Sequence, residues 1–488
     1  MENSRLKKLH DEWLVEATID EIQEKLANGE ISSKDLVLMY LYRIGQYDKD
    51  KINSILEVNP EALHIAAALD AERKTKGPRG PLHGIPVLVK DNIDTADHMH
   101  TSAGSLALEN SYALEDSHVA SLLREAGAII LGKTNMTEWA NFMTEGMPSG
   151  YSSRGGQVLN PYGQGKFDVG GSSAGSGASI AANLATVAVG TETSGSILSP
   201  ASQNSLVGIK PTVGLVSRRG IIPIAHSQDT AGPMTRTVKD AAYLLNVLTA
   251  HDDRDPITLT NAKLVNVDFT QFLNPEGLKG ARVGIARETY FDYLKDGQKV
   301  VLEQAIEKLK ELGADVIENI VIPSTKYEWS YDVLGYEFKS DLNAYLKGLP
   351  SYVRVRTLKD VIDFNNQNSE RTLKYGQKIL EEAEATSGTL TEEKYLQALE
   401  QDIYHSTEQG IDFVLAEHQL DAILFPNNFG AGIPAKAGYP SITVPAGYTE
   451  EGEPVGITFT SHAFSEGKLI ELGYAFEQGT NHRKPPEL

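Results

Sequence analysis

The chain has no cysteine among its 488 residues, which excludes disulfides, thiolate metal sites and a cysteine nucleophile. Covalent catalysis would therefore need an oxygen or nitrogen nucleophile. An excess of basic residues is also missing. The formal net charge is −21, which disfavours binding to nucleic acid and to anionic membranes. No apolar run approaches the roughly 18 residues that a membrane-spanning helix requires.

The first residues also lack the apolar segment of a signal peptide. We therefore expect a cytoplasmic protein, with the reservation that a mature chain whose leader has been removed would have the same sequence. Its length is sufficient to bury a large core, and the length alone allows two or three domains.

Apolar periodicity predicts helices and strands in alternation along most of the chain. Ser33, Ser117 and Thr237 are candidate helix N-caps, and Asp240 completes a capping-box pattern with Thr237. The predicted helices include residues 20–47, 62–74, 118–126, 178–184 and 468–478. The predicted strands include residues 52–58, 85–89, 128–131, 186–189, 422–425, 441–445 and 455–459. Strands near both ends with helices between them favour one large α/β domain.

Glycine and serine are concentrated at residues 170–177 and again at 194–196. Because glycine is costly inside helices and strands, this density predicts loops in which the backbone closely approaches something else. A small-residue helix and a buried strand separate the two loops, so Ser172 would lie at a helix N-terminus and Ser196 beyond a strand end. We interpret the pair of loops as a candidate active site.

Lys90 ends a predicted buried strand, where loss of hydration lowers the pKa of an amine and makes it available as a base. The alternative is a surface lysine paired with Asp91 or Asp94. Likewise, Ser172 can be a simple helix cap and Ser196 a turn residue.

Two phosphate-binding motifs fail at the glycine-rich loop. The P-loop lysine and the third glycine of the dinucleotide fingerprint are both absent. The nucleophile-elbow pattern does match residues 171–175, with Ser173 as nucleophile. Its base would be one of four histidines without motif context, at His226, His405, His418 and His462. His98 and His100 have metal-like spacing, but without further ligands a loop pair is the favoured interpretation.

Several ordered blocks resemble the amidase signature family, and specifically its peptide-amidase-like branch. They cover nearly the whole chain and are residues 84–94 (GIPVLVKDNID), 132–135 (GKTN), 138–141 (EWAN), 171–173 (GSS), 190–196 (GTETSGS), 207–212 (VGIKPT), 227–234 (SQDTAGPM) and 438–447 (GYPSITVPAG).

The resemblance implies a single α/β domain over residues 1–488, with a central mixed twisted β-sheet covered by helices on both faces. Within it we expect N-terminal helices at 1–75, a signature core at about 76–245 and a helical layer at about 290–419. The N-terminal helices and this layer are expected to roof the active-site cleft, and a loop containing Met147 and Ser149 is a candidate substrate-binding wall.

By motif position, the resemblance implies a Ser–cis-Ser–Lys triad with Ser196 as nucleophile, Ser172 as relay and Lys90 as base. Ser172 would follow a cis peptide bond from Gly171, and Ser173 would hydrogen-bond Lys90. The backbone N–H groups of Thr193, Ser194, Gly195 and Ser196 would form the oxyanion hole. Ser194 departs from the branch, which usually has aspartate there, and we expect this to alter substrate preference more than the triad.

The predicted function is hydrolysis of carboxamides to carboxylate and ammonia through an acyl-enzyme. Candidate substrates are C-terminal peptide amides and small aliphatic or aryl amides. We expect no cofactor, no metal, no nucleic-acid or membrane partner, and a monomer or homodimer. Three alternatives stay open: the amidase subunit of a tRNA-dependent amidotransferase, a noncatalytic homologue, and a Ser–His–acid hydrolase using Ser173.

Overall fold

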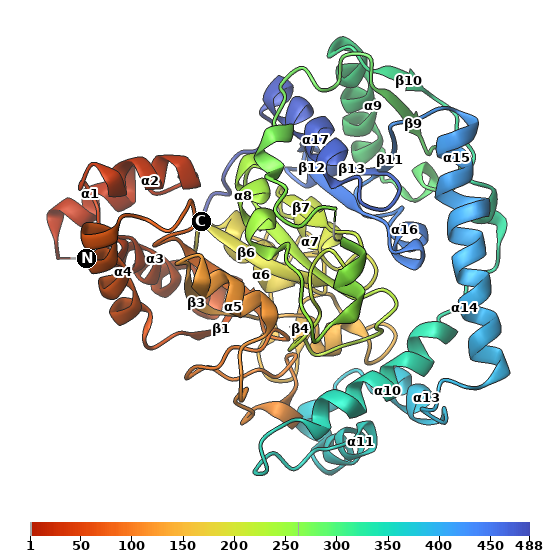
Figure 1. Cartoon of the computed structure of the whole chain (residues 1–488), viewed down its shortest axis with the longest axis horizontal. Helices are drawn as coiled ribbons and strands as arrows, with labels where there is room; N and C mark the ends of the chain where they lie inside the picture. Colours follow the sequence, from red (N-terminus) through yellow and green to blue (C-terminus); the bar gives the residue numbers. More distant parts are fainter. Residues whose placement is uncertain (1, 262) are drawn as a thin grey trace.

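An eleven-stranded mixed sheet forms the centre of the computed structural model, which describes residues 2–261 and 263–488 (Figure 1). In spatial order its strands are β1 (Ile55–Val58), β3 (Ile129–Thr134), β2 (Pro86–Lys90), β6 (Val187–Glu192), β8 (Thr230–Thr235), β7 (Val207–Lys210), β12 (Ser441–Tyr448), β13 (Pro454–Thr460), β11 (Ala422–Pro426), β9 (Arg282–Ile285) and β10 (Asp315–Ile317). A separate hairpin pairs β4 (Tyr151–Ser152) with β5 (Gly156–Gln157).

The sheet joins two stretches that are far apart in the chain. Strands β1–β3 and β6–β8 form one half and β9–β13 the other, and the halves meet where β7 pairs antiparallel with β12. Parallel pairs occur on both sides of this junction, between β2 and β6 and between β9 and β11. The single-domain α/β prediction with a mixed sheet is therefore confirmed.

Helices cover both faces of the sheet. On one side α6 (Ala174–Ala181) and α7 (Leu198–Gln203) contact one another and the central strands. On the other side α8 (Val238–Leu248) lies between α5 (His118–Glu125) and α17 (Glu466–Thr480), and α9 (Asp296–Glu311) covers β12 and β13.

Two further groups of helices flank this core at opposite sides in Figure 1. The N-terminal group comprises α1 (Ser4–Glu12), α2 (Ile19–Ala27), α3 (Ser33–Tyr47) and α4 (Ala62–Lys76). The other group comprises α10 (Asp332–Lys347), α11 (Leu358–Gln367), α12 (Ser369–Thr372), α13 (Lys378–Glu384), α14 (Glu393–Ser406), α15 (Asp412–Glu417) and α16 (Gly432–Ala437).

The predicted helix caps are correct at Ser117 and Thr237, whereas the cap at Ser33 and the capping box with Asp240 need correction. Ser117 caps α5 as predicted, accepting a hydrogen bond from Ala120 N. The cap of α3 is Ser32, because Ser33 is already helical. Thr237 caps α8, but the capping box is incomplete because the Asp240 carboxylate accepts Ile19 N from the N-terminal helices instead.

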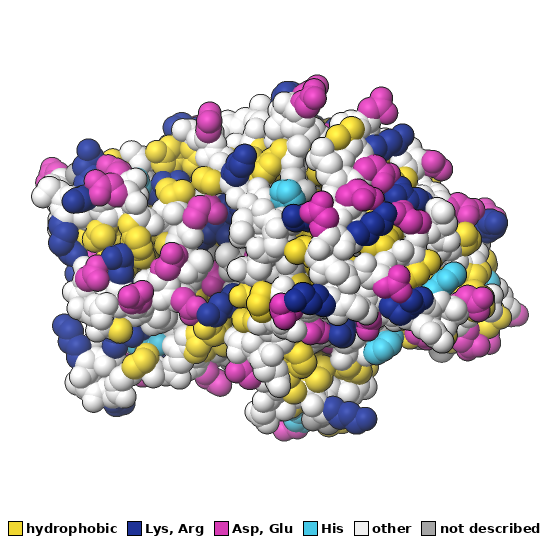
Figure 2. All heavy atoms as spheres, turned by 90° about the horizontal axis from the view of Figure 1, so that it is seen from above, with side chains coloured by type: hydrophobic (Ala, Val, Ile, Leu, Met, Phe, Trp, Pro, Cys, Tyr) yellow, Lys and Arg dark blue, Asp and Glu magenta, His cyan; other side chains and the backbone are white. Residues whose placement is uncertain are grey.

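Acidic and basic side chains are interspersed on the surface shown in Figure 2, and hydrophobic side chains occur there in small groups. Across residues 2–261 and 263–488, no helix combines the length and the apolar character needed to cross a bilayer.

Candidate active site

Lys90 is the last residue of β2, and its side chain is fully buried. The Lys90 amine has three oxygen contacts: Ser172 Oγ at 2.7 Å, Thr191 Oγ1 at 2.9 Å and Thr191 O at 3.3 Å. Asn92 Nδ2 also donates to Thr191 Oγ1, at 2.9 Å. These three oxygens can accept all three N–H donors of a charged Lys90, and in the neutral amine a lone pair takes the place of one N–H and can accept the Ser172 hydroxyl proton.

Burial lowers the pKa of Lys90 to about 7, because removal of water disfavours the charged ammonium. The nearby carboxylates of Glu192 and Asp229 act in the opposite direction, but their effect is smaller than that of burial. Near neutral pH a substantial fraction of Lys90 is therefore uncharged and able to accept a proton.

Ser172 lies in the loop immediately before α6 and is fully buried. The Gly171–Ser172 peptide bond is cis, as the resemblance implies. The expectation that Ser173 hydrogen-bonds Lys90 is wrong. Ser173 is the N-cap residue of α6, and its hydroxyl donates to Thr191 O at 3.0 Å. Ser173 therefore contacts the residue that orients Lys90 and does not itself contact the amine.

Ser196 lies between the end of β6 and the start of α7. Its carbonyl oxygen accepts Ser173 N at 3.1 Å, which holds the two glycine-rich loops side by side. In the described part of the chain, the Ser196 hydroxyl makes no hydrogen bond to Ser172. Lys90 therefore contacts Ser172 directly, and Ser196 lies on the second glycine-rich loop, bonded through its carbonyl to Ser173.

The Glu192 carboxylate organises the loop that carries Ser196. It accepts Gly195 N at 2.5 Å, Ile197 N at 2.7 Å and Leu198 N at 3.0 Å. Gly195 has a φ of +82°, in the left-handed region where glycine is favoured. Hydrogen bonds from several N–H groups to one carboxylate are strong and fix the course of the backbone.

These bonds correct the expected oxyanion hole. The Gly195 N–H already donates a hydrogen bond to Glu192, so Gly195 is not one of the N–H groups without an acceptor. Among the described residues, the N–H groups of Thr193, Ser194 and Ser196 have no acceptor. Three of the four expected donors therefore have no acceptor within the described chain.

Thr193 is held by a neighbouring loop whose role the sequence did not reveal. Its hydroxyl donates to Asp229 Oδ1 at 2.6 Å, and its carbonyl accepts Gln228 Nε2 at 3.1 Å. Burial raises the pKa of Asp229 to about 7. The sequence block containing Gln228 and Asp229 was recognised, but the contacts to Thr193 depend on strand β8 lying beside β6.

A cavity of about 510 Å³ opens at Ser196, and we call it the nucleophile cavity. Its lining includes Gly171, Thr193, Ser194 and Ser196, together with Met147 and residues of α10 and α13. The expectation that Ser149 lines the site is not supported. Its carbonyl accepts Gln157 Nε2 at 2.7 Å, and Ser149 is not among the lining residues.

The roof of the nucleophile cavity also differs from the expectation. Its walls come from the segment 140–147, from Gly171 and residues 193–196, from Ile224, and from the segments 331–336 and 379–386, so the helical layer contributes and the N-terminal helices do not. In Figure 1 the helices α1–α4 lie at the left of the molecule, whereas α10 and α13 lie at its lower right.

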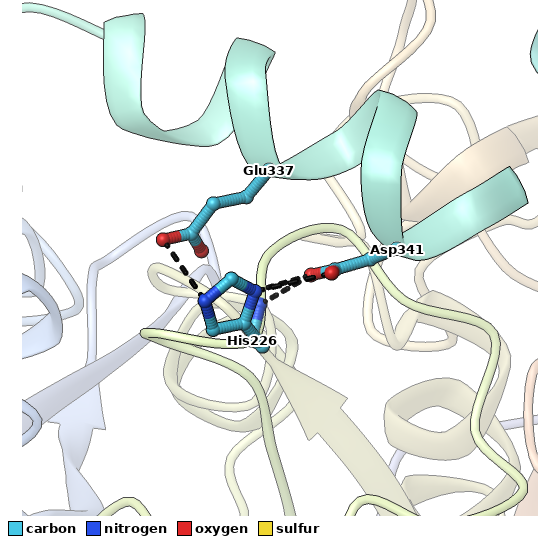
Figure 3. A group of neighbouring side chains, drawn as sticks. All are labelled: His226, Glu337 and Asp341. Atoms are coloured by element: carbon cyan, nitrogen blue, oxygen red, sulfur yellow. Dashed lines mark hydrogen bonds and ion pairs between the residues drawn. The ribbon is translucent and has the colours of Figure 1, made fainter. Parts of the chain in front are cut away.

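His226, Glu337 and Asp341 form a cluster with possible metal-ligand geometry (Figure 3). His226 Nδ1 lies 2.9 Å from Asp341 Oδ2, and Nε2 lies 3.5 Å from Glu337 Oε1. Glu337 also accepts hydrogen bonds from Ser227 and Tyr395. These bonds already use the ligand atoms, and we interpret the cluster as a clasp between the 224–229 loop and α10.

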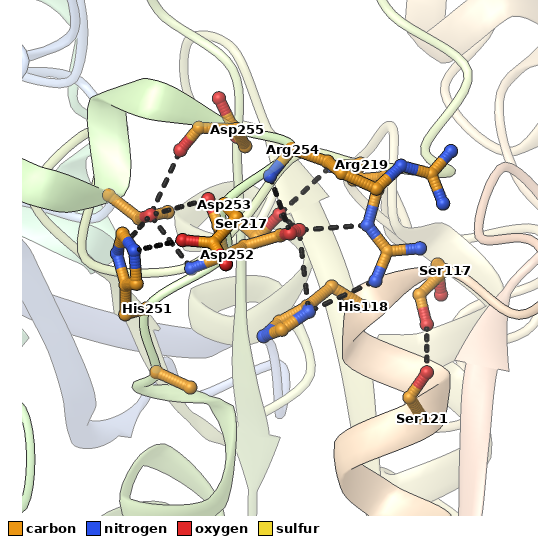
Figure 4. Close-up of polar contacts among 12 residues, drawn as sticks. Ser117, His118, Ser121, Ser217, Arg219, His251, Asp252, Asp253, Arg254 and Asp255 are labelled. Carbon is orange, nitrogen blue, oxygen red and sulfur yellow. Dashed lines mark hydrogen bonds and ion pairs between the residues drawn. The ribbon is translucent and has the colours of Figure 1, made fainter.

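A second polar cluster contains serine, histidine and aspartate but lacks the geometry of a catalytic triad (Figure 4). Ser217 Oγ donates to Asp252 Oδ2 at 2.7 Å, and His118 Nδ1 lies 3.3 Å from the same oxygen. The serine therefore contacts the acid and not the histidine, contrary to the arrangement that activates a nucleophile.

The nucleophile-elbow alternative likewise finds no histidine at Ser173, whose hydroxyl bonds Thr191 within the described chain. Three of the four candidate histidines have other contacts: His226 bonds Asp341, His405 stacks on Tyr327, and His462 contacts Ala463 O. His98 and His100, whose spacing resembled a metal site, bond two different residues, Glu61 and Glu57.

Comparison with known proteins agrees with the motifs over the whole chain. The family model described as Amidase matches residues 35–470. The chain belongs to the amidase family. A probable amidase of Arabidopsis thaliana is 43% identical over 484 residues, covering 97% of this chain and 92% of the relative. The family and these relatives identify the chain as a hydrolase acting on amide bonds.

Solved structures of the family have the same fold. The peptide amidase of Stenotrophomonas maltophilia is 44% identical with a TM-score of 0.92, covering 97% of this chain and 99% of its own. An amidase family protein of Bacillus anthracis is 41% identical with a TM-score of 0.94, covering 99% and 94%. A glutamyl-tRNA(Gln) amidotransferase subunit of Thermotoga maritima is more distant, at 26% identity and a TM-score of 0.72, covering 97% and 98%.

Proposed function

We propose that this amidase-family hydrolase converts carboxamides to carboxylate and ammonia, with Ser196 as nucleophile, Ser172 as relay and Lys90 as base. The observation that carries the proposal is the buried Lys90 amine, whose pKa is lowered to about 7 and which lies 2.7 Å from Ser172 Oγ. A neutral amine and a hydroxyl at this distance can exchange a proton.

In the proposed reaction, Ser196 Oγ attacks the amide carbonyl carbon and gives its proton to Ser172 Oγ. Ser172 passes its own proton to Lys90 Nζ, and the free N–H groups of Thr193, Ser194 and Ser196 stabilise the oxyanion. As the tetrahedral intermediate collapses, the C–N bond breaks and the same relay returns a proton to the departing nitrogen. Water then attacks the acyl-Ser196 ester along the reverse route and releases the carboxylate.

The proposed substrate class is carboxamides, with C-terminal peptide amides as the first candidates and small aliphatic or aryl amides as others. The resemblance to the Stenotrophomonas maltophilia peptide amidase supports this order. We propose that the chain acts alone, without metal or cofactor, as a cytoplasmic monomer or homodimer.

Alanine substitutions test the proposal. Lys90→Ala, Ser172→Ala and Ser196→Ala should each reduce ammonia release from a peptide amide by at least about 10³-fold, because the three groups act as a unit. Ser121→Ala on α5, away from the cavity, is the matched serine control. EDTA should leave the wild-type rate unchanged. If Ser196→Ala retains the rate while a histidine variant loses it, the triad assignment is wrong.

A further inference from the structure

A second cavity of about 450 Å³ adjoins the nucleophile cavity, and we call it the aromatic cavity. The two cavities share Ser194, Tyr331 and Leu334 as lining residues. Ser194 is therefore at the junction, two residues from the proposed nucleophile. Ligand pockets usually enclose about 300–1,000 Å³, so each cavity alone is large enough for a bulky group.

Aromatic rings dominate the second cavity. Its lining includes Tyr290, Tyr293, Trp329, Tyr331 and Phe429. The residues Tyr293 and Tyr331 are 70% and 77% exposed, so aromatic surface at the rim is open to a ligand. Trp329 Nε1 already donates to Ser324 O at 3.1 Å, so what the indole offers to a ligand is its ring.

The aromatic cavity also carries no uncompensated charge. Lys436 is the charged residue among its described lining residues, and Lys436 Nζ lies 2.5 Å from Asp402 Oδ2. Ser194 places a neutral hydroxyl at the junction of the two cavities. A charged group entering this cavity would lose hydration without gaining a free counter-ion, whereas an uncharged aromatic group would gain stacking contacts.

We propose that the aromatic cavity is a second substrate subsite that takes an uncharged aromatic group of the amide substrate. This inference rests on the proposed function of Ser196, because it assumes that the reacting amide lies in the nucleophile cavity. Ammonia is too small to need a cavity, so the group in the subsite belongs to the acyl part. The substrate class is thus narrowed to extended amides that bear an aromatic group remote from the scissile bond.

A pair of glycines permits a matched test. Gly432, the first residue of α16, lines the aromatic cavity, and a Cβ built there has no atom within 4 Å. Gly432→Trp should therefore fill the cavity without a backbone clash. Gly45, exposed on α3 and equally open, supplies the control Gly45→Trp away from both cavities.

The probes are N-acetylglycinamide and N-benzyloxycarbonylglycinamide, which differ in the remote aromatic group. Wild type and Gly45→Trp should show a kcat/KM at least tenfold higher for the benzyloxycarbonyl probe, measured as ammonia release. Gly432→Trp should reduce this ratio below threefold. Tyr293→Ala, which removes an exposed ring, should lower the ratio in the same direction and serves if Gly432→Trp does not fold.

A wild-type ratio near one, or a ratio that Gly432→Trp leaves intact, would overturn the subsite. Failure of the proposed function is distinguished by a binding measurement in the Ser196→Ala background. There the benzyloxycarbonyl probe should bind at least tenfold more weakly when Gly432→Trp is added. If wild type hydrolyses neither probe but this difference is present, the reaction assignment fails and the subsite stands. If the difference is absent, the subsite fails.

Discussion

The Lys90 side chain shows how one residue acquires its chemistry from burial. Loss of hydration lowers its pKa to about 7 even though Glu192 and Asp229 favour the charged form. Burial likewise raises the pKa of the Asp229 carboxyl group to about 7, so both groups change charge in the same pH range. The charge balance of this small cluster, and not Lys90 alone, sets the fraction of neutral amine.

Asp229→Asn separates the two groups. The amide can keep the same shape, accepting Ile224 N and Ala225 N through its oxygen and donating to Thr193 Oγ1 through its nitrogen. Removing the carboxylate removes an interaction that favours the ammonium, so the pKa of Lys90 should fall. The acidic limb of kcat/KM for ammonia release, expected near pH 7 in the wild type, should move to lower pH.

The plateau rate above the limb is the control in that experiment, because it reports whether Thr193 stays in place. A limb that stays near pH 7 in Asp229→Asn would mean that the charge of Asp229 does not govern the protonation of the catalytic base.

At the scale of single elements, α10 connects the substrate cavity to the core. Its first turn lines the nucleophile cavity, while Glu337 and Asp341 further along hold the 224–229 loop through His226 (Figure 3). The same loop supplies Gln228 and Asp229 to Thr193. The helical layer thereby stabilises the backbone that carries the proposed oxyanion donors.

The stability that the His226 clasp contributes to the fold should depend on pH. The hydrogen bond to Asp341 raises the pKa of His226, against the opposing effects of burial and of Arg218, while Glu337 adds to the rise. Because the folded-state pKa is higher than that of the unfolded chain, the stabilisation is complete below about pH 6.5 and is lost as pH rises through the raised value.

His226→Gln should therefore lower the urea midpoint more at pH 6 than at pH 9. The ring is 45% exposed, so the difference in unfolding free energy should be no more than about 1 kcal/mol. His64→Gln, exposed on α4, is the control. Equal effects of His226→Gln at the two pH values would contradict a charged clasp.

At the scale of the whole molecule, the two ends of the chain are tied together. The C-terminus lies beside the N-terminal helices in Figure 1, and the Arg483 guanidinium lies 2.7 Å from Glu16 Oε1. Arg483 also donates to Ala181 O and Ser205 O in the core. The sheet also joins distant parts of the chain, because β12 pairs with β7 from the first half of the sequence. The contacts of Arg483 are a second connection of this kind.

Arg483→Met should lower the free energy of unfolding by about 2–3 kcal/mol. Breaking a buried ion pair costs about 3–5 kcal/mol because one charge is left unpaired, and the 30% exposure of the Glu16 side chain lowers that figure here. Urea denaturation measures the change. The double variant Glu16→Gln/Arg483→Met should recover part of it, and an unchanged midpoint in Arg483→Met would show that the tie contributes nothing.

Local patterns in the sequence were enough for the elements that depend on nearby residues. The cap at Ser117, the strand ending at Lys90 and the two serine-bearing loops follow from periodicity and from glycine spacing, which act over a few residues. The family resemblance supplied the roles proposed for Lys90, Ser172 and Ser196. It also predicted the family membership that the comparisons show and the mixed sheet that the structure shows.

Contacts across the sheet and between distant loops were decided by tertiary structure alone. Glu192 accepts the Gly195 N–H that was expected to be an oxyanion donor. The Lys90 amine bonds Thr191 and not Ser173. The Asp240 carboxylate accepts Ile19 N and does not complete the capping box of its own helix. Each of these side chains has several possible partners by sequence. Which partner it meets depends on the order and register of strands and helices, and no local pattern encodes that arrangement.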